Sequence, residues 1–113
     1  MLAKPHRLTS AADYRAVVRR GRRYGSPHAV CYVRASTAAT PARFGFIVSK
    51  KVGIANRRNL VRRRLKAIGH ELVSRIPAGT DIVIRALPGS DDVPWATLHT
   101  EIITAIDKSV GTA

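Results

Sequence analysis

The sequence predicts one small α+β domain, an α/β sandwich in which helices pack on an open sheet. Its 113 residues are enough for a single hydrophobic core and too few for two domains of ordinary size, so residues 1–113 are expected to form one domain. Short β-rich runs alternate with segments whose apolar residues recur every three or four positions. The expected order is therefore helix, two or three strands, helix, strand, helix.

The first predicted helix covers residues 10–20. Ser10 is a typical N-cap residue, and Asp13 follows it at the spacing of a capping box. Gly21 is typical of a helix end.

Two strands are predicted next. Residues 29–35 combine β-branched and aromatic side chains, and their alternation places Val30 and Tyr32 on one face and Cys31 and Val33 on the other. Residues 36–43 have the small and turn-forming side chains of a hairpin loop, and residues 44–49 resume the strand pattern. The spacing predicts that these two strands form an antiparallel pair.

The second helix is predicted from Asn56 to about Arg75 and ends before Pro77 and Gly79. Its apolar residues lie at offsets that form one stripe of an α-helix. The stripe consists of Val61, Leu65, Ile68, Leu72 and Ile76.

A strand and a last helix complete the prediction. Residues 81–87 form an apolar run typical of a buried strand, and residues 88–94 form a loop. Asp92 is predicted to cap the last helix, which continues to about Ser109. The apolar face of that helix is expected to contain Trp95, Leu98, Ile102 and Ile106.

The charge of the chain indicates a polyanionic partner. Basic residues outnumber acidic ones by 20 to 7, a formal net charge of +13. Residues 1–75 hold 18 basic and 2 acidic side chains, whereas residues 76–113 hold 2 and 5. A protein gains affinity for nucleic acid from each counterion that it displaces from phosphate, so the acidic C-terminal third is expected to face away from the partner.

Residues 49–66 carry most of this signal, because eight of their eighteen side chains are Lys or Arg and none is acidic. Solvated helices usually alternate charge signs, whereas Arg58, Arg62 and Lys66 stand four residues apart and repel one another. That repulsion indicates that the helix binds an anionic partner, which would offset it. Arginine outnumbers lysine by 15 to 5, and its planar fork matches phosphate geometry and stacks on unpaired bases.

Backbone and shape recognition of folded RNA fits this helix better than DNA reading does. A major-groove recognition helix needs base-reading side chains on its exposed face. Here that face consists mostly of Arg and Lys, and Asn59 is the exception. Stacking surfaces for nucleotides could come from Tyr14, Tyr32, Phe44 and Phe46, although half or more of these are expected in the core.

Other classes of function have little support in the sequence. The four histidines are dispersed without metal-ligand spacing, and the acidic residues form no catalytic pair. Cys31 has no second thiol with which to form a disulfide or a metal site and is expected to be a small strand residue. No secretory signal or membrane segment is evident, so a cytoplasmic protein without membrane association is expected.

Several segments, in the same order along the chain, resemble the bacterial ribonuclease P protein component. The most specific are GFIVSKKVG at residues 45–53 and the pattern A-x-x-R-N-x-x-x-R at residues 55–63. Leu8–Tyr14 and Val18–Gly21 resemble the beginning and end of the family's first helix, and Gly79–Val83 matches its G-x-D-I-V-like spacing. The resemblance covers nearly the whole chain.

This resemblance implies a left-handed βαβ crossover and the role of a protein subunit in ribonuclease P. That ribonucleoprotein endonuclease removes the 5′ leader from precursor tRNA, and its catalytic centre is RNA that uses Mg²⁺ ions. The implied partners are the catalytic RNA and precursor tRNA, with neither DNA nor a membrane. The protein alone is expected to be non-catalytic, and it would bind the leader and support Mg²⁺ binding.

Matching positions give two sets of expected site residues. The RNA-binding set consists of Lys50, Lys51, Arg57, Arg58, Asn59, Arg62, Arg63 and Lys66. The leader-binding cleft consists of Tyr14, Val18, Tyr32 and Ser49. Two positions depart from the family pattern: Leu60 replaces a common Arg, whose contact is either lost or made by Arg57 or Arg64, and Val18 replaces a bulkier aromatic residue.

Two other classes share parts of this pattern. A ribosomal or ribosome-assembly protein would have similar charge and fold, but it would bind ribosomal RNA and show no dependence on a tRNA leader. A DNA-binding regulator would need dimerisation and a sequence preference in duplex DNA.

Overall fold

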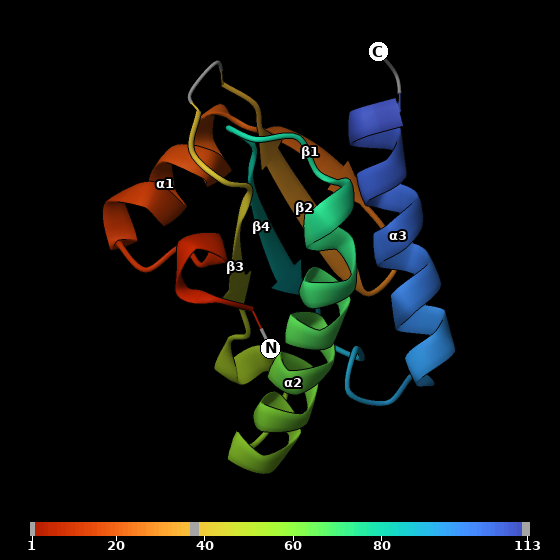
Figure 1. Cartoon of the computed structure of the whole chain (residues 1–113). Coiled ribbons are helices and arrows are strands. Elements are labelled where there is room, and N and C mark those ends of the chain that lie inside the picture. The colour runs from red at the N-terminus through yellow and green to blue at the C-terminus, as the bar shows by residue number, and fades with distance from the viewer. Residues whose placement is uncertain (1, 37–38, 112–113) are drawn as a thin grey trace.

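A computed structural model describes residues 2–36 and 39–111 of the chain. It contains the helices and strands labelled in Figure 1: α1 (Ala11–Arg20), β1 (Arg22–Gly25), β2 (Ala29–Arg34), β3 (Arg43–Ile47), α2 (Ala55–Leu72), β4 (Asp81–Ala86) and α3 (Trp95–Gly111). Short 3-10 helices cover Lys4–His6, Lys50–Val52 and Val73–Arg75. The predicted α+β class and element order are confirmed, with three strands between the first two long helices.

The strands form one sheet in the order β1-β2-β4-β3. Strand β2 is antiparallel to both β1 and β4, whereas β3 is parallel to β4. The predicted antiparallel pairing of residues 29–35 with residues 44–49 is therefore wrong. Strand β4 lies between them and pairs with both, and its fully buried Ile82, Val83 and Ile84 are typical of a central strand covered on both faces. The predicted hairpin loop, residues 36–43, includes residues 37–38, which lie outside the described residues.

Strand β1 was not predicted, because its sequence, RRYG, lacks an apolar alternation. It forms a hairpin with β2 in which Arg22 pairs with Val33 and Gly25 with Val30. As the edge strand of the sheet, β1 can carry charged side chains without burying them.

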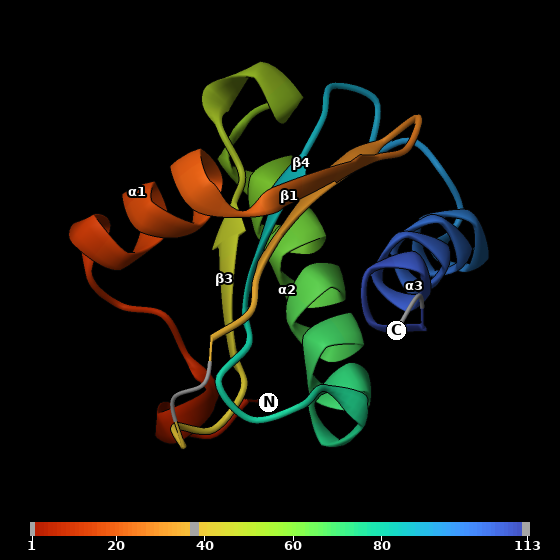
Figure 2. The ribbon, with the colours of Figure 1, turned by 90° about the horizontal axis from the view of Figure 1, so that it is seen from above.

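Helices cover both faces of the sheet, as Figure 2 shows: α1 lies on one face, and α2 and α3 lie on the other. The predicted alternation in β2 is confirmed. Val30 and Tyr32 pack with Val17 of α1, whereas Cys31 and Val33 belong to the larger core beneath α2 and α3. The sheet thus separates a small core from a large one.

Helix α2 connects the parallel strands β3 and β4. In Figure 1 both strands run downward, α2 lies in front of them, and the chain moves from β3 to β4 on the right. This geometry is a left-handed crossover, as the family resemblance implied, and it departs from the usual right-handed rule.

The predicted helix signals are largely confirmed. Ser10 caps α1, its Oγ accepting hydrogen bonds from the backbone N–H groups of Ala12 and Asp13 at 3.1 and 3.3 Å. The whole predicted apolar stripe of α2 is buried, and it continues to Ile76 beyond the helix end.

Two predictions about α3 are wrong. The helix begins at Trp95, and the carboxylate of Asp92 lies 4.0 Å from the guanidinium of Arg57 instead of capping the helix. Trp95 is 40 % exposed and packs against His99 in a tilted arrangement, with ring centroids 5.4 Å apart, so it lies outside the buried face. The other predicted members of that face, Leu98, Ile102 and Ile106, are fully buried.

One charged contact joins the neighbouring strands β3 and β4, and another joins the sheet to α3. Arg43 on β3 donates to both carboxylate oxygens of Asp81 at 2.9 Å, and this hydrogen bonding raises the pKa of Arg43. Glu101 on α3 accepts from the backbone N–H of His28 at 2.8 Å and contacts its ring Nδ1 at 2.7 Å. Burial acts to raise the pKa of Glu101, but these hydrogen bonds outweigh it and hold the pKa below its ordinary value. The β1–β2 turn is thereby fixed to α3.

Replacing Gly21, where α1 turns into β1, should destabilise the fold. A Cβ there would lie 2.5 Å from the backbone oxygen of Val17 and 3.0 Å from that of Val33, and neither can move without shifting the backbone. We expect Gly21→Ala to lower the free energy of unfolding by about 1–3 kcal/mol, measured by urea denaturation followed by circular dichroism.

Gly25 offers the matched control, because a Cβ there would meet no atom within 4 Å. Gly25→Ala should leave stability unchanged or raise it by up to about 1 kcal/mol. Equal losses in the two variants would contradict the packing described at Gly21.

Candidate nucleic-acid interface

The outer face of α2 carries a shallow basic hollow of about 490 Å³. Its lining consists of Asn56, Asn59, Arg62, Arg63 and Lys66. The Oδ1 of Asn59 accepts a hydrogen bond of 3.0 Å from Arg62, which orients that guanidinium. No acidic side chain lines the hollow. It forms because the opposite stripe of the helix is held in the core, so these polar positions must face outward.

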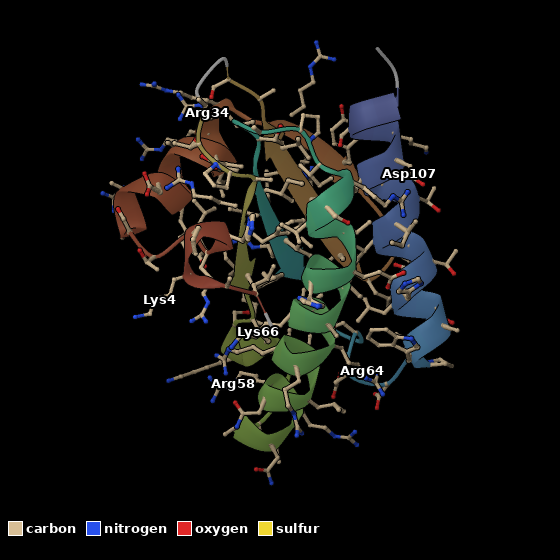
Figure 3. All side chains as sticks on the ribbon, in the orientation of Figure 1. Lys4, Arg34, Arg58, Arg64, Lys66 and Asp107 are labelled. Atoms are coloured by element: carbon tan, nitrogen blue, oxygen red, sulfur yellow. The ribbon has the colours of Figure 1, made fainter. Side chains whose placement is uncertain are left out.

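Arg58 lies beside this hollow and is partly withdrawn from solvent. Its Nε is buried and has no hydrogen-bond acceptor among the described residues. Figure 3 shows Arg58 and Lys66 on the side of α2 that faces away from α3, whereas Arg64 faces α3. A buried guanidinium N–H without an acceptor is costly, and an anionic ligand could supply that acceptor.

Arg57 and Arg64 bind the segment that precedes α3. The guanidinium of Arg57 lies 3.8 Å from Asp91 and 4.0 Å from Asp92, and Arg64 donates to the backbone oxygen of Val93 at 3.0 Å. Of the predicted RNA-binding set, Arg57 is thus the member with carboxylate neighbours. Arg57 and Arg64 are the two residues expected to replace the Arg that is missing at position 60. Both make these contacts with the segment before α3.

The turn between β3 and α2 adds two exposed lysines. Ser49 precedes the 3-10 helix Lys50–Val52, in which Val52 is buried and anchors the turn. Lys50 and Lys51 are exposed and lead the chain into the basic helix. The turn therefore places these two lysines before the N-terminal end of α2, whose outer face carries the basic hollow.

A second candidate site is a groove of about 190 Å³ between α1 and the sheet. Its lining consists of Tyr14, Arg15, Val18, Arg19, Ile47 and Arg85. Of the predicted cleft residues, Tyr14 and Val18 line this groove and Tyr32 packs in the same cluster, but Tyr32 is only 8 % exposed. Ser49 lies apart from the groove lining, in the turn after β3.

The three arginines of the groove were missed by the sequence reasoning. Arg15 and Arg19 stand four residues apart on a helix, so their shared face could have been recognised from spacing alone. Arg85 could not, because its place beside α1 depends on the central position of β4 in the sheet.

The chemistry of these surfaces is that of anion binding. Among residues 2–36 and 39–111, no three His, Cys, Asp or Glu side chains gather as metal ligands. His28 and His99 are paired with Glu101 and Glu71, each at 2.7 Å. Burial raises the pKa of Cys31 to about 12, so its thiol is unsuited to act as a nucleophile. No helix in the described part of the chain is long and apolar enough to cross a bilayer.

Comparison with known proteins gives a consistent result. The family model described as Ribonuclease P matches residues 2–110. The ribonuclease P protein component of Clavibacter michiganensis is 53 % identical over 112 residues, covering 99 % of both chains. That of Kocuria rhizophila is 43 % identical over 110 residues, covering 97 % of this chain and 96 % of the relative.

Solved structures share the fold. The RNase P protein of Staphylococcus aureus superposes with a TM-score of 0.83 at 22 % identity, covering 93 % of this chain and 95 % of that one. The protein from Thermotoga maritima gives 0.78 at 24 % identity, covering 90 % and 96 %. With the sequence relatives, these matches show that the chain belongs to the ribonuclease P protein component family, the protein part of a ribonucleoprotein endoribonuclease that acts in tRNA processing.

Proposed function

We propose that the protein binds the catalytic RNA of ribonuclease P through α2 and the preceding turn. The observation that carries this proposal is the basic hollow on α2, which contains no acidic side chain. Arg58 supports it, because its buried Nε has no acceptor within residues 2–36 and 39–111, and a phosphate oxygen would provide one. The side chains assigned to this contact are Lys50, Lys51, Arg58, Asn59, Arg62, Arg63 and Lys66, with Arg57 at the margin beside Asp91.

We propose further that the groove beside α1 receives the 5′ leader of precursor tRNA. Its lining combines apolar and aromatic side chains, which can pack against bases, with three arginines, which can contact phosphates. Tyr32 would mainly support the floor of the groove and make little direct contact with the leader, because its ring is buried against Val17 and Val83. Tyr14 is also anchored from behind, since its hydroxyl oxygen accepts a hydrogen bond of 3.2 Å from the backbone N–H of Phe46.

Mg²⁺ ions in this proposal belong to the RNA. The described residues do not fit a metal site made by the protein alone, since they contain no group of three potential ligands. Protein-bound Mg²⁺ typically takes one or two carboxylates together with phosphates, and the basic hollow on α2 offers no carboxylate. The contribution of the protein would be to neutralise phosphates electrostatically, which lowers the ion concentration that the folded RNA requires.

Removing charge from α2 should reduce the salt dependence of RNA binding. We expect replacement of Arg58, Arg62 and Lys66 by Ala to weaken binding to ribonuclease P RNA and to lower the salt slope by up to about 2.1–2.7, about 0.7–0.9 for each lost phosphate contact. The measurement is a filter-binding titration at several salt concentrations. A triple variant at Lys4, Arg75 and Lys108 loses the same charge elsewhere and should retain most of the slope. An unchanged slope in the α2 variant would remove this helix from the interface.

The protein should lower the Mg²⁺ requirement of cleavage. We expect a 5′-labelled precursor tRNA to be cleaved at low Mg²⁺ only when ribonuclease P RNA and the protein are both present. A lane with the protein alone should show no leader removal. Failure of the folded protein to stimulate its cognate RNA would favour a ribosomal or assembly role instead.

The leader groove can be tested through Arg85, whose exposed side chain can be changed without disturbing the core. We expect Arg85→Gln to weaken the affinity of the assembled enzyme for precursor tRNA by about three- to tenfold, equivalent to about 0.7–1.4 kcal/mol. Affinity for mature tRNA, which lacks the leader, should be unchanged, and Arg75→Gln should affect neither. Equal losses for both RNAs would argue against leader binding in the groove.

A further inference from the structure

A third basic hollow, of about 330 Å³, lies at the opposite end of the molecule from the N-terminal half of α2. Arg20, Arg22 and Arg34 line it, together with Tyr24, Val33 and Ser109. Figure 3 shows Arg34 at the end opposite Arg58. We propose that this arginine pocket binds a phosphate group of RNA, so that the protein bridges two separate RNA segments. The inference rests on the proposed function in taking RNA as the partner.

Three elements bring these arginines together. Helix α1 ends at Arg20, and Gly21 turns the chain directly into β1. The hairpin register places Arg22 opposite Val33, so that Arg34, the next residue of β2, lies at the same end of the sheet. Val33 and Tyr24 belong to or pack against the large core and form a rigid wall of the pocket. Their backbones are held by secondary structure, so the fold fixes where the three arginine side chains leave the chain around the pocket.

The grouping of the three arginines is not fully explained by exposure to solvent or by protection of the sheet edge. A charged residue such as Arg22 on an edge strand discourages pairing with another chain. That role requires nothing of Arg20 or Arg34, which come from a helix and from an interior strand.

The pocket also lacks any compensating negative charge. None of its lining residues is acidic, and none of the three arginines has a carboxylate partner within the described parts of the chain. On the adjoining helix α3, Asp107 is occupied by Arg75 at 2.8 Å. Three guanidinium groups around one hollow repel one another, and an anion between them would reverse the sign of that energy.

The chemistry of the pocket favours a phosphodiester over other anions. Guanidinium groups can donate paired hydrogen bonds to phosphate oxygens, and the half-buried ring of Tyr24 gives an adjoining base a surface on which to stack. Membrane headgroups would require a broad apolar face beside the charges, whereas this site is a hollow lined by arginines. An acidic protein segment could pair with the arginines, but it has no base to stack on the ring of Tyr24.

The first test removes two pocket charges and compares the result with a matched loss elsewhere. Arg22→Gln with Arg34→Gln should lower the salt slope for ribonuclease P RNA by about 1.4–1.8, since each lost phosphate contact accounts for about 0.7–0.9. Lys4→Gln with Arg75→Gln removes the same net charge and should change the slope by less than half as much. Equal slopes for the two double variants would overturn the proposal, and full retention of RNA affinity by the pocket variant would point to an acidic protein partner.

The second test maps which RNA segment lies beside each site. An iron chelate attached at Ala35→Cys, on the rim of the pocket, cuts nearby RNA by hydroxyl radicals, and the same chelate at Asn59→Cys reports the RNA beside α2. The native Cys31 should not be labelled, because it is buried and its pKa is raised to about 12. Cuts from the two positions should fall in different segments of the assembled enzyme's RNA.

The alternative outcomes separate the two proposals. Cuts from position 59 but none from position 35 would overturn the arginine pocket and leave the function of α2 intact. Cuts from both positions in one segment would overturn bridging. An absence of cuts from both positions, with the proteins folded, would overturn the proposed function itself.

Discussion

Strand β4 is the constraint through which every other element is placed. Ile82, Val83 and Ile84 are fully buried, and neither face of the strand can be left to water. Val83 requires α1 on one side, whereas Ile82 and Ile84 require the core beneath α2 and α3 on the other. Each such side chain contributes about 1.5–3 kcal/mol when buried. The position of β4 therefore governs how the basic hollow on α2, the groove beside α1 and the arginine pocket are arranged relative to one another.

Helix α2 combines two functions that compete energetically. Its like-charged side chains repel one another by a few tenths of a kcal/mol per pair. Burial of Val61, Leu65, Ile68 and Leu72, each with no exposed surface, contributes several times more. The helix can consequently tolerate an acid-free outer face in the absence of RNA. Its contacts through Arg57 and Arg64 further fix it to the segment before α3.

The sequence predicted local structure well and non-local pairing poorly. The Ser10 cap and the stripe of α2 depend on residues a few positions apart, and both were correct. The β-strand pairing was wrong because adjacency in sequence favoured a hairpin, whereas the burial demand of β4 favoured insertion between the two strands. Strand β1 has no apolar signal of its own and depends on backbone pairing with β2.

The same distinction applies to the candidate sites. The basic residues of α2 are close in sequence, so their shared face followed from helical periodicity. The pairing of Arg57 with Asp91 joins residues from two elements, and it could not be read from a charge run. The meeting of Arg20, Arg22 and Arg34 likewise requires the register of a strand pair that sequence reasoning did not find. The family resemblance supplied the crossover handedness, which periodicity does not contain.

The sheet order also determines when the protein can fold during its synthesis. Strands β1, β2 and β3 leave the ribosome before β4, yet β3 has no partner strand until β4 is inserted beside it. Helix α2 likewise emerges before the central strand and α3 that complete its core. A nascent chain of this topology must hold a strongly basic, incompletely packed segment next to ribosomal RNA until its last third is made. Such non-local assembly delays folding to the end of translation and exposes the unfinished chain to the most abundant polyanion in the cell.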